Sequence, residues 1–265
     1  MAEDLLGRER APSRSVGPSA AALAWHQYRL ERRMFWRNPS AAFFNFLLPL
    51  LFLFLIGALL SGDQDQLDVL VPGIAGMSVL STTFSALAMN LVFLREQGVL
   101  KRVRGTPLPS GAYLSALGAN AVTNAAIQVT IVVVAGRVFF GTGWPEDYVE
   151  LVVFVVAGVA CLAALGVAFS HVIPNFDSAP AFVNVVFLPV IFVSGVFFDA
   201  ENAPAFLRDI GRALPLTHVI DGLRGAMVTG ASLADNAGSL AVIASWGVVG
   251  AVLAVRGFSW EARRS

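Results

Sequence analysis

The sequence contains few side chains whose type and spacing suit covalent chemistry. Its single lysine, Lys101, follows Leu100 and precedes Arg102, whereas a phosphate-binding loop needs lysine in a glycine-rich turn and then serine or threonine. The three histidines are far apart and have no carboxylate or thiol at ligand spacing, so no metal site is predicted. The lone cysteine, Cys161, lies in an apolar run without an evident histidine partner. We therefore expect no catalytic site, metal or cofactor in this chain.

Polar side chains within apolar runs form a second set of candidates. They are Asn120, Asn124 and Gln128 in one run, and Asn184 and Ser194, with Gly195 beside it, in another. The first three recur at every fourth position, which places them on one face of a helix. Amides in lipid bond across helices for about 0.6 kcal/mol each, so helix packing is favoured, and a translocation path stays open as the alternative. No acidic residue lies inside an apolar run except Glu96 at an end, which argues against an ion-coupled carrier.

The third candidate is a basic segment, residues 95–109, which separates two long apolar runs. Gly98 and Gly105 are expected to bound a short helix, and Pro107 and Pro109 to end it. A simple topological anchor would explain the positive charge alone. Because glycine and proline residues delimit a short, compact segment, we favour a defined docking element instead.

The elements around these candidates are predicted to lie in a membrane. Of the 265 residues, 56% are hydrophobic and only 14% are charged, and the mean hydropathy is +0.70. A span needs about 20 apolar residues to cross roughly 30 Å of hydrocarbon. We expect an all-α integral membrane protein with a disordered cytoplasmic tail at 1–19 and one transmembrane domain at 20–265. Its six transmembrane helices are predicted at about 41–61, 69–94, 113–140, 150–173, 179–198 and 237–255.

Charge predicts the orientation. If the spans alternate, 14 of the 18 basic residues fall on one side, before the first span, at 95–104 and after the last span. Acidic residues cluster on the other side, namely Asp63, Asp65, Asp68, Glu146, Asp147 and Glu150. The positive-inside rule therefore predicts that both termini and segment 95–109 are cytoplasmic. The net charge is zero, and no nucleic-acid partner is expected.

Residues 20–38 are predicted to form an interfacial helix at the membrane surface. Arg29, Arg33 and Arg37 form a basic ridge at helical spacing, and aromatic residues lie beside it: Trp25, Tyr28, Phe35 and Trp36. Basic and aromatic faces directly before a span suit the membrane interface, although a soluble core helix is the alternative. Asn38-Pro39 is expected to end this helix, because proline removes a backbone donor.

Two short segments, 204–213 and 216–228, lie between the last two predicted spans. At about 1.5 Å per residue, both are too short to cross the membrane. They carry several charges, which are tolerated at depth only against protein or water. A re-entrant hairpin that dips in from outside and a surface loop with two interfacial helices fit equally well.

Segment 95–109 resembles a known family. Its pattern is similar to the cytoplasmic signature of type-2 ABC exporter permeases, through Glu96-x-Gly98-x-x-Lys101-Arg102-x-Arg104-x-Thr106-Pro107-Leu108. These permeases are membrane subunits of daunorubicin-resistance and polysaccharide or Nod-factor export systems. The segment before the last span also resembles that family, through Leu214-Pro215-Leu216-Thr217-His218 with Leu223-Arg224. The resemblance covers about 20–255.

The resemblance implies roles that the residues alone do not establish. It implies a homodimer bound to two copies of a separate ATPase subunit, which would hold ATP and Mg²⁺. The coupling helix that docks on this ATPase would involve Arg95, Glu96, Gly98, Lys101, Arg102, Arg104, Thr106 and Pro107. The outer gate would be re-entrant and involve Pro204, Pro215, His218 and Arg224. The first and fifth spans would lie near the dimer axis, and the second and fifth would line the path.

We therefore expect an ATP-driven exporter permease in the bacterial cell (inner) membrane that moves a hydrophobic or amphiphilic compound, such as a drug or lipid. The apolar spans and 20 phenylalanines favour such a cargo over a free ion. Export of a polysaccharide or lipid-linked glycan remains an alternative within the class, because aromatic side chains also stack on sugars. An autonomous channel or ion-coupled carrier is the alternative from a different class.

Overall fold

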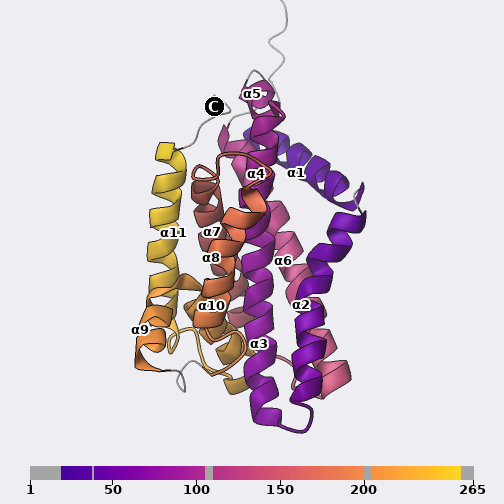
Figure 1. Ribbon diagram of the computed structural model, residues 1–265, viewed down its shortest axis with the longest axis vertical. Helices are drawn as coiled ribbons and strands as arrows, with labels where there is room; N and C mark the ends of the chain where they lie inside the picture. Colours follow the sequence, from indigo (N-terminus) through magenta and orange to yellow (C-terminus); the bar gives the residue numbers. More distant parts are fainter. Residues whose placement is uncertain (1–18, 38, 105–109, 200–203, 258–265) are drawn as a thin grey trace, which may run out of the picture.

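The computed structural model describes residues 19–37, 39–104, 110–199 and 204–257. These residues form a bundle of helices, most of which run along the long axis of the molecule (Figure 1), with no strand among them. The helices before α6 are α1 Ala20–Arg37, α2 Pro39–Leu59, α3 Gln64–Leu80, η1 Ser81–Ser85, α4 Ala86–Glu96 and α5 Val99–Arg104. Those that follow are α6 Ser110–Phe140, α7 Tyr148–Phe169, α8 Ala179–Val193, α9 Ala205–Ala213, α10 Pro215–Arg224, η3 Gly225–Thr229 and α11 Ala237–Gly257.

The prediction of an all-helical membrane protein is confirmed in its coarse form. Within the described ranges, four helices are long and apolar enough to cross a membrane: Gln64–Glu96, Gly111–Phe140, Tyr148–Phe169 and Ala237–Arg256. The other two predicted spans correspond to shorter apolar helices, Phe46–Leu59 and Ala179–Val193. At about 1.5 Å per residue, the 15 residues of α8 extend about 22 Å, which is less than a typical hydrocarbon core.

The break between α1 and α2 lies where proline predicts it. Helix α1 ends at Arg37, and α2 begins at Pro39. Proline is tolerated in the first turn of a helix, because the missing N–H has no intrahelical acceptor there. In Figure 1, α1 is inclined across the top of α6 and α2, and the chain then turns into the bundle.

Glycines allow the central helices to approach one another closely. A Cβ at Gly166 of α7 would lie 2.7 Å from the carbonyl oxygen of Phe84 in η1, and one at Gly250 of α11 would lie 2.9 Å from the backbone nitrogen of Leu165. Helix–helix interfaces in membranes favour small residues for this reason. Helix α7 thereby packs tightly against both η1 and α11.

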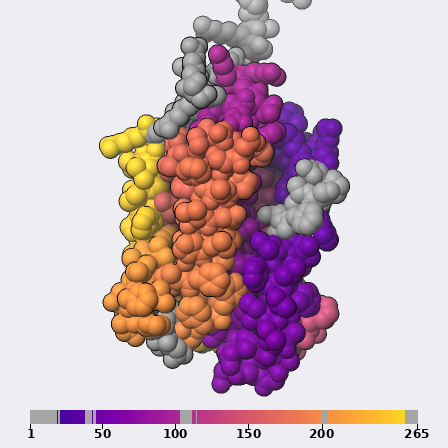
Figure 2. Space-filling model, in the orientation of Figure 1, coloured from indigo at the N-terminus to yellow at the C-terminus, as the bar shows by residue number. Residues whose placement is uncertain are grey.

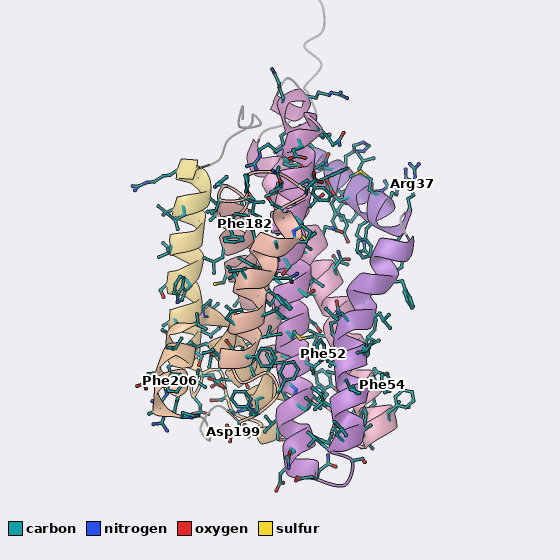
Figure 3. The ribbon with its side chains drawn as sticks, viewed as in Figure 1. Arg37, Phe52, Phe54, Phe182, Asp199 and Phe206 are labelled. Carbon is teal, nitrogen blue, oxygen red and sulfur yellow. The ribbon has the colours of Figure 1, made fainter. Side chains whose placement is uncertain are left out.

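The two ends of the bundle differ in charge. The end that carries α5 and the C-terminus of α11 (the α5 end) also holds Arg37, whereas Asp199 and Phe206 lie at the opposite end, beside α9 (the α9 end; Figure 3). The α2–α3 turn lies at the α9 end as well (Figure 1), and Asp63 there caps α3 by accepting from the backbone N–H of Gln66 at 3.2 Å. Basic and acidic residues that were predicted to lie on opposite sides are therefore found at opposite ends of the bundle, and which end faces the cytoplasm stays a prediction.

Candidate functional site

The turn between α4 and α5 is built around Gly98. This glycine has a φ of +66°, a left-handed conformation that residues with a Cβ rarely adopt. Its N–H donates to the carbonyl of Arg95 at 3.2 Å, which closes α4, and its own carbonyl accepts from the N–H of Arg102 at 3.2 Å, which opens α5. Gly98 therefore allows one helix to stop and the next to begin within two residues.

Helix α5 is short and anchored on one side only. Leu100 is buried and only 2% exposed, whereas Lys101 and Arg102 are exposed. The helix ends at Arg104, while Thr106 and Pro107 lie outside the described residues. Two cationic side chains are thus presented at the α5 end on an element that is fixed from behind.

Arg95 differs from its predicted role. It is only 6% exposed, and its guanidinium donates to the carbonyls of Ser170 at 3.2 Å and Ile173 at 2.7 Å. A side chain buried in this way holds the turn after α7 and offers little surface to another protein. The family resemblance grouped Arg95 with the docking residues, and charge in the sequence does not show which cation turns inward.

Glu96 connects α4 to the same turn. One carboxylate oxygen accepts from the backbone N–H of Phe176 at 2.8 Å, and the rings of Phe93 and Phe176 lie 5.2 Å apart. We call the contacts of Arg95 and Glu96 with residues 170–176 the α4 clasp. It joins the turn that carries α5 to the loop between α7 and α8, a connection that the sequence analysis missed.

The predicted interfacial helix is α1, and most of its aromatic and basic candidates are exposed. Trp25 and Trp36 are 61% and 55% exposed. The three ridge arginines, Arg29, Arg33 and Arg37, are also exposed. The aromatic side chains pack along the helix: Trp25 stacks on Tyr28 at 5.2 Å, and Phe35 and Trp36 meet edge-to-face at 5.5 Å.

Helix α1 is bonded to α6 through the polar face that the sequence singled out. Arg32 donates to the side-chain oxygen of Asn124 at 2.5 Å, and the hydroxyls of Tyr28 and Thr123 lie 3.1 Å apart. Asn124 therefore has a packing contact. Gln128 is buried one turn further along α6.

The remaining candidates within apolar runs divide between α6 and α8 with its C-terminal end. Asn120 is partly buried, and its carbonyl oxygen has no hydrogen-bond partner within the described chain. On α8, Asn184 is exposed, whereas Ser194 is buried at the helix end. Gly195 has a φ of +74° and turns the chain away from α8. Asn120 thus lies one turn from Asn124 on α6, whereas the other three candidates lie on α8 or at its end.

The predicted outer-gate residues lie together at the α9 end. Pro204 caps α9 and Pro215 occupies the first turn of α10. The Nε2 of His218 lies 2.9 Å from the carbonyl of Arg212 and its Nδ1 lies 3.2 Å from the Ser239 hydroxyl. A carbonyl only accepts, so Nε2 carries a proton, and neutral His218 would accept from Ser239. The ring therefore connects the α9–α10 corner to α11.

Beside this corner is a polar cavity of about 320 Å³. Arg224 forms an ion pair with Asp199 at 3.7 Å along its wall. Arg208, Arg212 and Asp221 also line it. The charged side chains that line this cavity belong to α9, to α10 and to the segment that follows α8.

Glu150 is a site that the sequence analysis did not find. It was grouped with exposed outer carboxylates, yet it is 0% exposed in the first turn of α7. The side-chain amide of Asn236 donates to its Oε1 at 2.7 Å, while Oε2 has no hydrogen-bond partner within the described residues. This contact joins α7 to the residue immediately before α11.

A second cavity of about 530 Å³ is almost wholly apolar and lies where η1, α7, α8, α10 and α11 meet. Phe84, Leu162, Phe187 and Trp246 contribute to its wall, and His171 lies among the lining residues nearest the α4 clasp. Figure 2 shows α8 in orange across the front of the molecule, with α11 in yellow to its left. A cavity of this size and polarity suits an apolar group of a ligand.

Comparison with known proteins finds transport proteins of the membrane among the relatives of this chain. The model of the ABC-2 type transporter family matches residues 23–228. Nodulation protein J of Rhizobium meliloti (strain 1021) is 25% identical over 218 residues, which are 78% of this chain and 83% of the relative. The putative transport permease ycf38 of Porphyra purpurea is 27% identical over 74% of this chain and 71% of its own. Inner membrane transport permease YadH of Escherichia coli (strain K12) is 22% identical over 60% of this chain and 62% of its own.

The family match covers most of the chain, including α1, α5 and the α9–α10 corner. The predicted resemblance is thereby confirmed at the level of the family. The chain belongs to the ABC-2 type transporter family and is the membrane subunit, rather than the ATPase, of an ABC transporter.

Proposed function

We propose that this chain is the permease of an ATP-driven exporter, and that α5 is the coupling helix that receives work from a separate ABC ATPase. The observation that carries the proposal is the α4 clasp. Helix α5 presents Lys101 and Arg102 outward, while Glu96 bonds the start of the same turn to Phe176. A push on α5 would therefore reach the α7–α8 connection directly.

In this proposal the α5 end faces the cytoplasm, and both termini lie on that side. The exposed arginines and tryptophans of α1 support a place at the membrane interface, where amphipathic aromatics and cationic side chains are favoured. The bilayer would be the bacterial cell membrane. ATP and Mg²⁺ would be held by the ATPase alone.

We also propose six spans, with α2 and α8 as the first and fifth, and a homodimer bound to two ATPase copies. Both helices carry large exposed apolar side chains, including Leu51 (48% exposed), Leu55 (58%), Val185 (73%) and Phe192 (55%). Phe54 of α2 packs against Phe139 of α6, with ring centroids 4.9 Å apart, while Phe52 turns inward and lies 5.4 Å from Phe197 (Figure 3). A second copy or lipid would cover this face, and the family resemblance favours a second copy.

The cargo that we propose is hydrophobic or amphiphilic. The apolar cavity of about 530 Å³ beside η1 and α8 supports this class over a free ion. Helices α9 and α10 would form the re-entrant outer gate, because their buried faces and charged cavity allow polar groups to face protein rather than lipid.

Reconstitution tests the proposal. The purified chain in liposomes, with a fluorescent amphiphile inside or in the bilayer, should move it only when the ABC ATPase that co-purifies with it and ATP are present. Hydrolysis by that ATPase should rise when the permease is added. Transport by the chain alone without nucleotide would identify an autonomous channel or carrier and reject the proposal.

A further inference from the structure

A third cavity, of about 470 Å³, lies beneath α1 where this helix faces η1, α4 and α6. Its polar lining consists of Glu31, Thr82, Asn90, Asn120 and Asn124. The cavity shares no lining residue with the apolar cavity beside α8. We call it the α1 cavity.

Two acceptors of the α1 cavity, on Glu31 and Asn120, have few hydrogen-bond partners. Glu31 is only 7% exposed and forms no ion pair within the described part of the chain, and its Oε1 accepts a hydrogen bond from the side-chain amide of Gln27 at 2.8 Å. The Oδ1 of Asn120 is buried without a hydrogen-bond partner. A buried carboxylate and an unsatisfied carbonyl oxygen are both costly unless something donates to them.

The cation next to Glu31 in sequence does not meet this need. Arg32 follows Glu31 in sequence, but it donates to Asn124, and its guanidinium carbon lies 5.9 Å and 5.7 Å from the rings of Phe35 and Trp36. The ridge residues Arg29 and Arg33 are exposed. Burial raises the pKa of the Glu31 carboxyl above its usual 4.5, because the charged form is desolvated.

The rest of the lining is apolar. Met34 and Phe35 contribute from α1, Phe93 from α4 and Leu117 from α6. The cavity therefore joins the carboxyl group of Glu31 and the unpartnered amide oxygen of Asn120 to an apolar wall. A ligand with a positively charged hydrogen-bond donor and a hydrocarbon body fits both parts.

We propose that the α1 cavity binds the protonated amine of an amphiphile, with the ammonium on Glu31 and Asn120 and the chain against Phe35 and Phe93. The inference rests on the proposed export function, because it defines a substrate class and a place of entry beside α1. The amine could belong to a free amphiphile or to the head group of an aminolipid.

Direct binding tests this inference. The full-length chain in phosphatidylcholine nanodiscs should bind radiolabelled dodecylamine more tightly than dodecanol. Glu31→Gln should weaken dodecylamine binding about tenfold, the loss expected for a charge-assisted hydrogen bond, and leave dodecanol binding unchanged. Asn120→Leu should weaken it less, Glu31→Asp should restore part of it, and the exposed control Asp65→Asn should have no effect.

Equal affinity for amine and alcohol, or an unchanged affinity in Glu31→Gln, would overturn the inference. If phosphatidylethanolamine displaces dodecylamine, the site takes the amine of a lipid head group. If this lipid leaves dodecylamine binding unchanged, the site takes the amine of a free amphiphile. Complex formation with the ATPase is measured on the same samples. If the ATPase binds but the chain does not prefer the amine over the alcohol, only the proposed amine site is rejected. If the wild-type chain binds the amine but no ATPase, the proposed export function is rejected and the amine site is supported.

Discussion

The carboxylate of Glu96 accepts a hydrogen bond from the backbone N–H of Phe176 at 2.8 Å, although the two residues are 80 positions apart. The adjacent Arg95 reaches the same connection from inside the bundle. The exposed helix α5 is therefore not an isolated loop element. The α4 clasp connects α5, through α4, to the loop that precedes α8.

Arg95 should be needed for stability rather than for ATPase contact. Arg95→Met removes the donors to the carbonyls of Ser170 and Ile173, and should lower the free energy of unfolding by about 2–3 kcal/mol. Arg95→Lys, with one compact donor group, should recover only part of this loss. Thermal unfolding in nanodiscs measures the effect, and the exposed Arg33→Met is the control. An Arg95→Met chain as stable as the control would contradict the role assigned to the buried guanidinium.

Gly98 should be required for its backbone conformation rather than for lack of space. A Cβ at this position would meet no atom within 4 Å, so a larger residue would fit sterically. At a φ of +66°, Gly98→Ala should cost about 1–2 kcal/mol or displace α5. We expect weaker stimulation of the ATPase by this variant. Gly111→Ala is the matched control, since that glycine also has open space and no positive φ. Equal behaviour of the two variants would show that the left-handed turn is dispensable.

The contact between Glu150 and Asn236 should stabilise the α9 end. Asn236→Leu leaves a buried carboxylate without its donor and should cost about 2–3 kcal/mol. Glu150→Gln should cost less, because the amide oxygen can still accept from Asn236 and no charge is buried. Unfolding of both single variants and the double variant gives the coupling energy, for which we expect about 1.5–3 kcal/mol. If the changes in the free energy of unfolding of the two single variants simply add in the double variant, the proposed contact between these side chains is contradicted.

Glu31 should make stability depend on pH. Because the pKa of Glu31 is raised in the folded state, ionising this carboxyl lowers the free energy of unfolding. This loss of stability is absent well below pH 4.5 and grows as pH rises through the folded pKa. Tyr113 on α6 is close enough to interact electrostatically with this carboxyl, and Arg32 is engaged by Asn124. Glu31→Gln should therefore raise the Tm at neutral pH without ligand, and the gain should shrink as pH falls toward 4.5. A Tm difference that does not vary with pH would refute the assignment, with Asp65→Asn as control.

Local chemistry made several elements predictable. Pro39 marks the break between α1 and α2, Gly98 marks the start of α5, and Pro215 separates α9 from α10. Each of these residues restricts its own backbone, so its effect does not depend on distant partners. The predicted boundaries are consequently close to the observed ones at these points.

Burial of individual charges was not predictable in the same way. Arg95, Glu31 and Glu150 look like surface charges in sequence, yet all three are less than 10% exposed. Each is buried by an element that lies far away in sequence or by the inclination of a whole helix. The α4 clasp and the α1 cavity therefore follow from tertiary packing and carry no local sequence signal.

The central claim is that α5 transmits the work of an ABC ATPase, and charge reversal on its exposed face tests it most directly. In Lys101→Glu/Arg102→Glu, binding of the co-purifying ATPase and stimulation of its hydrolysis should fall at least about tenfold, because two cations at a docking surface become anions. Insertion and Tm should be unchanged. The matched control, Arg33→Glu/Arg256→Glu, alters two other exposed cations of the same end and should keep ATPase stimulation. Full stimulation and transport by the α5 variant would contradict the account.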